Sequence, residues 1–333
     1  MKQKLIGLFL LLATIFLVAC SEETSKEQTD SLKKVQLYLD WTPNTNHSGI
    51  YVAKEKGYFE EHGLDVEIML PGEVRTEQIV ATNKAPFGIS FQPHVTQARA
   101  ENLPVVSIAA IIQHHTGGYG LPADKQIKSP KDFEGRTYGA YGSSLERALL
   151  QVLMEKEGGN ADLVDFYQLG NSDVFAATQK DIDFVGMFYA WTGIEALVRG
   201  IDFDFIRTID YAPELDTYSP LIITNEKTIE QDEEMVQAFV HAVKKGYDFA
   251  IDQPEEAAAI LIQAVPDLNP ELVKRSQEWL SPHYKEGATH WGTQELERWQ
   301  TYADFMYDNQ IIDQEIDAAQ AFDARFIEEA SKK

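Results

Sequence analysis

Segments with the pattern of strands and segments with the pattern of helices alternate along this chain, and this alternation restricts the possible folds most. Residues 35–40 are rich in β-forming residues, residues 50–61 have apolar residues at helical spacing before Gly63, and residues 65–70 again have a strand pattern. The alternation continues over residues 76–113. It predicts a mostly parallel sheet with helices on both faces.

The same alternation returns in the middle of the chain. Residues 137–140, 164–168 and 184–188 are expected strands, and residues 144–157 and 173–180 are expected helices. This pattern predicts a second α/β unit of similar construction.

Two segments that begin at Phe87 and Val185 share one plan in detail. Each has a strand with a glycine, an aromatic or polar cluster, a short helix and a second strand. We interpret them as equivalent parts of two similar lobes, and a chance match of common βαβ patterns is the alternative. The matched pairs are Gly88 with Gly186, Phe91 with Tyr189, and Gln97 with Glu195.

Two stretches rich in glycine, proline and small polar residues, 116–122 and 216–220, can hold crossings between the lobes. Residues from 229 onward are mainly helical and are expected to pack on the first lobe. A hinge of two crossings between two α/β lobes suits closure on a small ligand. The predicted boundaries are 33–118 with 220–333 for lobe I, and 119–219 for lobe II.

The N-terminus indicates export from the cell. Lys2 and Lys4 precede an apolar stretch, residues 5–18, and small residues lead to Cys20. This is the pattern of a signal peptide, residues 1–19. It resembles a bacterial lipobox, which implies a lipid on Cys20, a polar tether over residues 20–32 and an extracytoplasmic protein anchored to the cell membrane. An ordinary signal peptide with a chance cysteine is the alternative.

The composition excludes several classes of function. Cys20 is the only cysteine, so with its thiol lipidated the chain has no disulfide, thiolate nucleophile or cysteine metal site. The formal net charge of −24 argues against nucleic acid as a partner. The chain has no HExxH, GxSxG or GxxxxGK motif and no acidic calcium loop. We therefore expect binding rather than catalysis, without a metal or cofactor.

Aromatic residues follow several of the expected strands. In an open α/β sheet, ligands bind beyond the carboxyl ends of the strands, where Trp41, Phe91, Tyr141 and Tyr189 fall. An aromatic ring stacked on a flat ligand contributes roughly 0.5–1.5 kcal/mol beyond the buried area. We favour a binding site for a flat ring, and the alternative is that these side chains only fill the space between the lobes.

Polar residues at the same strand ends are further candidates. Glu195 lies on the first turn of the helix after Tyr189 and could accept two hydrogen bonds from an amino-substituted ring, or could be an ordinary surface glutamate. Ser143 and Ser144 begin a helix, where backbone N–H groups could hold a carbonyl, carboxylate, phosphate or sulfonate. An N-cap serine is an equally good interpretation.

The histidines are less informative. His114 and His115 are neighbours on an expected strand, so their side chains would point to opposite faces and would not share a metal ion. His47 and His94 lie near strand ends and could line the cleft as hydrogen-bonding groups.

Four segments carry a resemblance to a known family: LDWTPNTNHSGIYVAKEKGYFEEHGLDVEI, FGISFQPHV, YGSSLERALL and FYAWTGIEA. They resemble the NMT1/THI5-like solute-binding proteins of bacterial ABC importers, from about Val35 onward. The match is strongest to the branch that binds formylaminopyrimidine in thiamin salvage, because W-T-P-N is typical of the pyrimidine-related members. The segment around Gly57 is shared with nitrate, sulfonate and riboflavin binders.

The resemblance implies a type II periplasmic-binding-protein fold for a monomer that delivers its ligand to ABC permease subunits. It also implies a pyrimidine ring stacked between Trp41 and Tyr189, with Glu195 reading the amino group and the adjacent ring nitrogen. Weaker candidates for the ring substituent are Asn44, Tyr119, Ser143 and Ser144.

The same superfamily includes a fungal enzyme that makes the thiamin pyrimidine from pyridoxal phosphate and its own histidine. That enzyme depends on a cysteine-rich iron motif, which a chain whose only cysteine is Cys20 does not have. We therefore predict a lipid-anchored solute-binding protein for formylaminopyrimidine. The alternatives are a binder of riboflavin or of a sulfonate, and a pyrimidine-synthesising enzyme.

Overall fold

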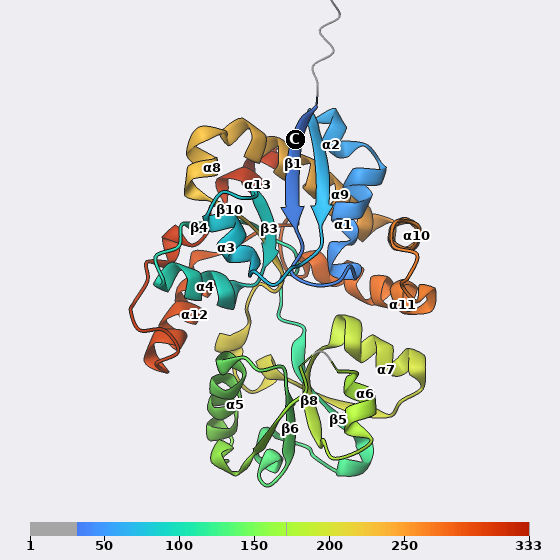
Figure 1. Cartoon of the computed structure of the whole chain (residues 1–333), viewed down its shortest axis with the longest axis vertical. Helices are drawn as coiled ribbons and strands as arrows, with labels where there is room; N and C mark the ends of the chain where they lie inside the picture. The colour runs from blue at the N-terminus through green and yellow to red at the C-terminus, as the bar shows by residue number, and fades with distance from the viewer. Residues whose placement is uncertain (1–31, 171, 333) are drawn as a thin grey trace, which may run out of the picture. The chain divides into compact units, whose positions relative to one another are not determined.

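The computed structural model of the chain describes residues 32–170 and 172–332. Ten strands form two five-stranded sheets, and we call the parts of the chain built on them the first and second lobes (Figure 1). The first sheet has the order β2-β1-β3-β10-β4, with β10 antiparallel to both neighbours. Its strands are β1 (Lys33–Tyr38), β2 (Leu64–Met69), β3 (Phe87–Ser90), β4 (Val105–Ala110) and β10 (Leu221–Asn225).

The second sheet has the order β7-β6-β8-β5-β9 and follows the same plan. Here β5 is the antiparallel strand, between β8 and β9. Strands β3 and β8 occupy equivalent positions in the two sheets. They contain the two similar segments that begin at Phe87 and Val185 in the sequence. The strands are β5 (Gly117–Pro122), β6 (Thr137–Ala140), β7 (Asp165–Gln168), β8 (Phe184–Phe188) and β9 (Phe203–Arg207).

Strand β5 differs from the expectation, because residues 116–122 were expected only as a crossing. The glycines that suggest a turn are instead required by close packing. A Cβ atom at Gly118 would lie 2.2 Å from the carbonyl oxygen of Ile206, and one at Gly120 would lie 2.0 Å from the methyl group of Met187. The predicted boundary after residue 118 therefore falls inside β5.

Helices cover both faces of the first sheet. The contact between α1 and α9 is close, because a Cβ atom at Gly246 of α9 would lie 2.0 Å from the carbonyl oxygen of Gly49 of α1. The expected helix over residues 50–61 is divided at Gly57, whose φ is 74°. The helices of this lobe are α1 (Ser48–Glu55), α2 (Tyr58–Glu61), α3 (Thr76–Ala81), α4 (Gln92–Ala100), α8 (Glu226–Gln231), α9 (Glu233–Asp252), α10 (Pro254–Ala264), α11 (Pro270–Leu280), α12 (Leu296–Asp308) and α13 (Arg325–Ala330).

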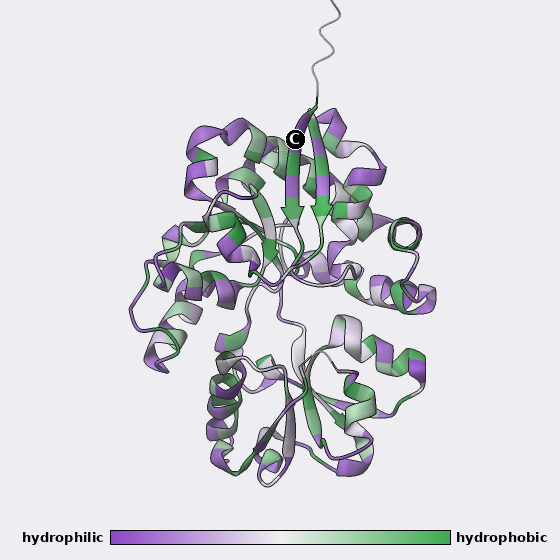
Figure 2. Ribbon diagram, viewed as in Figure 1, coloured by the Kyte–Doolittle hydropathy of each residue, from purple (hydrophilic) through white to green (hydrophobic). Residues whose placement is uncertain are grey.

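The second lobe has the helices α5 (Ser144–Lys156), α6 (Val174–Thr178) and α7 (Ile194–Arg199). Its core is built around Phe133 and Phe184, whose rings stack at a centroid distance of 4.0 Å. Helix α12 belongs to both parts: Trp299 packs into a first-lobe cluster, and Tyr302 packs into the core of the second lobe. Figure 2 shows both hydrophilic and hydrophobic residues along the helices, as expected of helices that pack one face against a sheet and expose the other.

The N-terminal predictions concern residues that the structure mostly does not describe. The expected signal peptide and Cys20 lie outside the described residues, as does the tether except for Leu32. Within the described part of the chain, no helix is both long enough and apolar enough to cross a membrane.

Candidate functional site

Trp41 lies on a well-structured turn just beyond β1, and its side chain is 48% exposed. Asn44 holds this turn together. Its Oδ1 accepts a hydrogen bond from the N–H of Asn46 at 2.9 Å, and its Nδ2 donates to the carbonyl oxygen of Thr42 at 3.1 Å. Asn44 is only 5% exposed, and its side-chain amide stabilises the turn through these two hydrogen bonds. The Trp41 ring is therefore exposed to solvent, while hydrogen bonds hold the backbone turn that carries it.

A buried hydrogen bond between His47 and Asp40 stabilises the same turn. His47 Nε2 lies 2.8 Å from Asp40 Oδ1, and the N–H of Asn44 donates to His47 Nδ1 at 3.2 Å. Because Nδ1 accepts an N–H, the ring proton is on Nε2 and is donated to Asp40. The His47 side chain is fully buried, so it braces the Trp41 turn and does not line a cleft.

Tyr189 begins a π-helix, Tyr189–Gly193, between β8 and α7. Such irregular turns occur frequently at functional sites. The half-buried ring lies 5.2 Å from the ring of Phe205 and 5.3 Å from that of Trp279, between centroids. Trp279 belongs to α11 of the first lobe. Sequence reasoning missed it, because a tryptophan within an amphipathic helix gives no signal that it meets a strand end of the other lobe.

A second pair of rings meets at the equivalent strand ends. Phe91 follows β3 and Phe188 ends β8, and their rings are nearly parallel, at 14°, with centroids 6.1 Å apart. Phe188 is 39% exposed, and the ring of His115 contacts it edge-on at 5.6 Å. Phe188 was missed as a site residue, although its place at a strand end next to Tyr189 could have indicated it. The aromatic contacts of the described residues do not join Trp41 directly to Tyr189.

His94 lies on the first turn of α4, beside Phe91. Its ring meets that of Phe91 edge-on at 5.5 Å, and its Nδ1 lies 3.6 Å from Glu77 Oε1. Glu77 is buried and also accepts a hydrogen bond from Ser90 Oγ. Burial alone would raise the pKa of Glu77, but His94 and the Ser90 hydroxyl outweigh it and hold the pKa below its usual value.

Glu195 lies on the first turn of α7, with its side chain 24% exposed. Its Oε1 accepts a hydrogen bond from Arg199 at 2.5 Å, and Arg199 also pairs with Asp173 at 2.8 Å. Among the described residues, the second carboxylate oxygen of Glu195 makes no hydrogen bond. The carboxylate is therefore fixed at one oxygen and can accept at the other.

The N-terminus of α5 already holds a carboxylate of this chain. The N–H groups of Tyr141, Gly142 and Ser143 donate to Glu146 at 3.0, 2.9 and 2.9 Å. The Ser143 hydroxyl accepts from Leu145 N–H at 3.2 Å, which completes a capping box. Ser144 is the first residue of α5. A ligand anion placed at these N–H groups would meet the negative charge of Glu146, so the geometry favours the capping interpretation.

Tyr119 lies in the middle of β5, in the core of the second lobe. Its side chain is 7% exposed and contacts the rings of Phe133, Tyr138 and Phe184 at 5.2–5.9 Å. Burial raises the pKa of its hydroxyl well above the usual value. This position favours a packing role, away from the strand ends that carry Trp41 and Tyr189.

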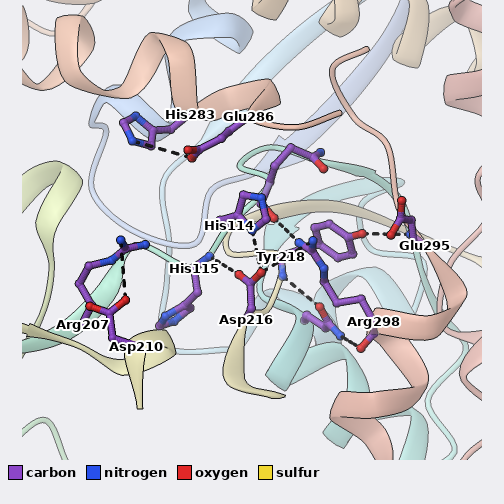
Figure 3. Close-up of polar contacts among 12 residues, drawn as sticks. His114, His115, Arg207, Asp210, Asp216, Tyr218, His283, Glu286, Glu295 and Arg298 are labelled. Carbon is purple, nitrogen blue, oxygen red and sulfur yellow. Dashed lines mark hydrogen bonds and ion pairs between the residues drawn. The ribbon is translucent and has the colours of Figure 1, made fainter. Parts of the chain in front are cut away.

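His114 and His115 were expected on a strand, and this was wrong, because β4 ends at Ala110 and both residues lie beyond it, between β4 and β5. Figure 3 shows the ring of His114 directed at Asp216, in the other crossing, whereas His115 meets Asp216 through its backbone N–H and its ring points away. His114 Nδ1 lies 2.6 Å from Asp216 Oδ2, the N–H of His115 donates to Oδ1 at 2.9 Å, and Arg298 lies 3.7 Å from Oδ2. These contacts join the two crossings to each other and to α12.

Two pKa values in this cluster are shifted. Burial would raise the pKa of Asp216, but hydrogen bonds from His114 and the His115 N–H, with the charge of Arg298, keep it below its usual value. Burial lowers the pKa of His115 to about 4, and the charge of Asp216 only partly opposes this.

Residues 32–170 and 172–332 contain no arrangement that indicates a metal site. Among the described residues, no group of three or more histidine, cysteine, aspartate or glutamate side chains is placed to hold a metal ion. Two surface cavities, of about 300 and 230 Å³, are lined mainly by polar residues and by none of the aromatic rings described above.

Two lobes with this strand order have the architecture of the periplasmic-binding-protein fold, and aromatic side chains lie where their strand ends meet. The sequence comparisons agree. Residues 44–257 match the family described as NMT1/THI5 like. The chain is 30% identical over 323 residues to the formylaminopyrimidine-binding protein of Halalkalibacterium halodurans, across 94% of this chain and 96% of that protein. This chain therefore belongs to the NMT1/THI5-like family, as the sequence resemblance predicted.

One further sequence relative and one solved structure are also similar to this chain. The chain is 26% identical to the 4-amino-5-hydroxymethyl-2-methylpyrimidine phosphate synthase of Legionella pneumophila, across 89% of this chain and 93% of that enzyme. The periplasmic aliphatic sulphonate binding protein SsuA from Escherichia coli superposes with a TM-score of 0.67 at 14% identity, across 86% of this chain and 91% of that one. The structural match confirms the predicted fold class. The solute-binding role is supported by the similarity to the formylaminopyrimidine-binding protein.

Proposed function

We propose that this protein is the extracytoplasmic solute-binding component of an ABC importer and that it binds formylaminopyrimidine between its lobes. The protein is anchored through a lipid on Cys20 and delivers the ligand to the permease. The observation that carries the proposal is the 30% identity, over 94% of the chain, to a protein named for binding this pyrimidine. The exposed ring of Trp41 and the aromatic strand ends support it.

The flat ligand ring stacks between Trp41 and Tyr189, which come from different lobes. Each ring contributes roughly 0.5–1.5 kcal/mol beyond the apolar area that it buries. Glu195, held at Oε1 by Arg199, accepts hydrogen bonds from the amino group of the pyrimidine at its second oxygen. A ring without that amino group leaves the carboxylate partly unpaired in a closed site, which gives selectivity.

A sulfonate is disfavoured as the ligand at the start of α5. The three N–H groups that would hold it already donate to Glu146. Riboflavin is flat as well, so aromatic stacking alone does not discriminate against it, and it belongs in the binding experiment as a competitor.

The experiment is a calorimetric titration of the purified protein with formylaminopyrimidine, its deformylated amine and riboflavin. We expect one-to-one binding, tightest for formylaminopyrimidine, and recovery of the unchanged ligand by mass spectrometry after prolonged incubation. Absence of pyrimidine binding contradicts the proposed ligand. Chemical conversion of the pyrimidine contradicts the binding-only role and favours the enzymatic alternative.

A further inference from the structure

The segments that carry Trp41 and Tyr189 are connected by a chain of buried hydrogen bonds through one residue of α11. Ser276 Oγ lies 2.6 Å from Thr45 Oγ1, which follows the Trp41 turn. Ser276 Oγ also donates to the carbonyl oxygen of Ala190, which follows Tyr189. Ser276 thus contacts both ring-bearing segments, although they belong to different lobes.

The direction of these hydrogen bonds is determined by chemistry. A carbonyl oxygen only accepts, so the single proton of the Ser276 hydroxyl is given to Ala190. The contact between the two hydroxyls therefore has Thr45 as the donor. Thr45 and Ser276 are fully buried and Ala190 is 2% exposed, so water does not replace a lost partner at low cost.

The surroundings hold both ends of the chain of hydrogen bonds in place. On the first-lobe side, Tyr284 OH donates to the carbonyl oxygen of Thr45 at 2.5 Å, and Tyr247 OH donates to that of Asn46 at 2.7 Å. These contacts fix the backbone directly after the Trp41 turn. Any displacement of Thr45 therefore has to break other buried hydrogen bonds as well.

On the second-lobe side, the π-helix docks onto first-lobe helices. Ala190 packs into the main hydrophobic cluster of the first lobe, and Trp191 packs against α10 and α11 residues such as Leu261 and Val273. One turn beyond Ser276 on α11, Trp279 contacts the ring of Tyr189. Helix α11 lies next to α7 in Figure 1 and contacts it.

We propose that Ser276 is a positioning residue for ligand binding, because its hydroxyl links the Trp41 turn to the π-helix that carries Tyr189. It sets the relative placement of the two stacking rings without contact to the ligand. This inference rests on the proposed binding of a flat ligand between the lobes, and it assigns a role to a residue outside the expected set of site residues.

The chain offers a matched control for the loss of a buried serine hydroxyl. Ser281 directly follows α11 and is 3% exposed. Its hydroxyl lies 2.7 Å from the carbonyl oxygen of Gln277 and 2.9 Å from that of Ala250, both within the first lobe. Ser276→Ala and Ser281→Ala remove the same chemical group from similarly buried sites. Only the first substitution removes a connection between lobes.

The first readout needs no ligand. Backbone amide hydrogen exchange of the purified full chain is compared for the wild type, Ser276→Ala and Ser281→Ala. We expect faster exchange over residues 45–48 and 190–194 in Ser276→Ala, and wild-type exchange there in Ser281→Ala. Unchanged exchange of either segment in Ser276→Ala, or the same increase in the control, overturns the proposed linkage.

The second readout is the affinity for formylaminopyrimidine. Ser276→Ala is expected to weaken binding about tenfold, the effect of losing one buried hydrogen bond. Thr45→Val, which removes the donor, is expected to weaken binding similarly, whereas Thr45→Ser keeps the hydroxyl and retains most of the affinity. Wild-type affinity in Ser276→Ala, or an equal loss in Ser281→Ala, overturns the positioning role. If the wild type binds no pyrimidine, the proposed function fails, and the exchange data still decide the linkage.

Discussion

Replacement of Trp41 by alanine tests the stacking surface that the structure exposes. The Trp41 side chain is 48% exposed in the structure. An aromatic side chain of this kind buries up to about 250 Å², so roughly 120 Å² is open to a ligand, and one face of the ring accounts for about half of that. At about 25 cal/mol per Å², covering one face is worth about 1.5 kcal/mol. With stacking of roughly 0.5–1.5 kcal/mol, the expected loss is about 2–3 kcal/mol.

This loss corresponds to about 30- to 150-fold weaker binding of formylaminopyrimidine by calorimetric titration. The free energy of unfolding is expected to change by less than about 0.5 kcal/mol, because the ring contributes little to the core. Tyr307→Ala removes an aromatic side chain that is 37% exposed on α12, and it serves as the matched control. Wild-type affinity in Trp41→Ala refutes the stacking role. A large loss of stability would show instead that the ring is structural.

Substitutions at three other residues test other parts of the molecule. Glu195→Gln is expected to weaken pyrimidine binding about tenfold by loss of a charged acceptor, measured by the same titration, while an unchanged affinity would remove Glu195 from the site. The pKa of His115 is lowered to about 4, so as the pH falls below about 6.5 the unfolded chain takes up a proton that the native histidine does not. Stability is therefore expected to decline between about pH 6.5 and 4, and denaturant unfolding should show a flatter decline for His115→Gln; equal slopes would contradict the assignment. Finally, Cys20→Ser is expected to move the protein from the membrane fraction to the soluble fraction, and a persistent membrane association would contradict the lipid anchor.

Much of the fold could be predicted because apolar periodicity is local. The expected strands over residues 137–140 and 184–188 coincide with β6 and β8. The repeat of Phe87 and Val185 segments corresponds to equivalent strands in two sheets. Strand β5 was missed because its glycines are explained by neighbours that are distant in sequence, such as Ile206.

The candidate site was less accessible from sequence, because its geometry depends on contacts between the lobes. Trp279 and Ser276 lie on an amphipathic helix and meet the second lobe only in three dimensions. Glu146 is different: Ser143 and Glu146 form the S-x-x-E pattern of a capping box, so the occupied helix N-terminus could have been recognised. The roles of Trp41 and the other proposed ligand contacts remain predictions.

A crystal structure of the protein with bound formylaminopyrimidine tests the proposed binding mode most directly. We expect the pyrimidine ring between Trp41 and Tyr189, with its amino group hydrogen-bonded to Glu195. A ligand located elsewhere, for example between Phe91 and Phe188 without contact to Trp41, would contradict it.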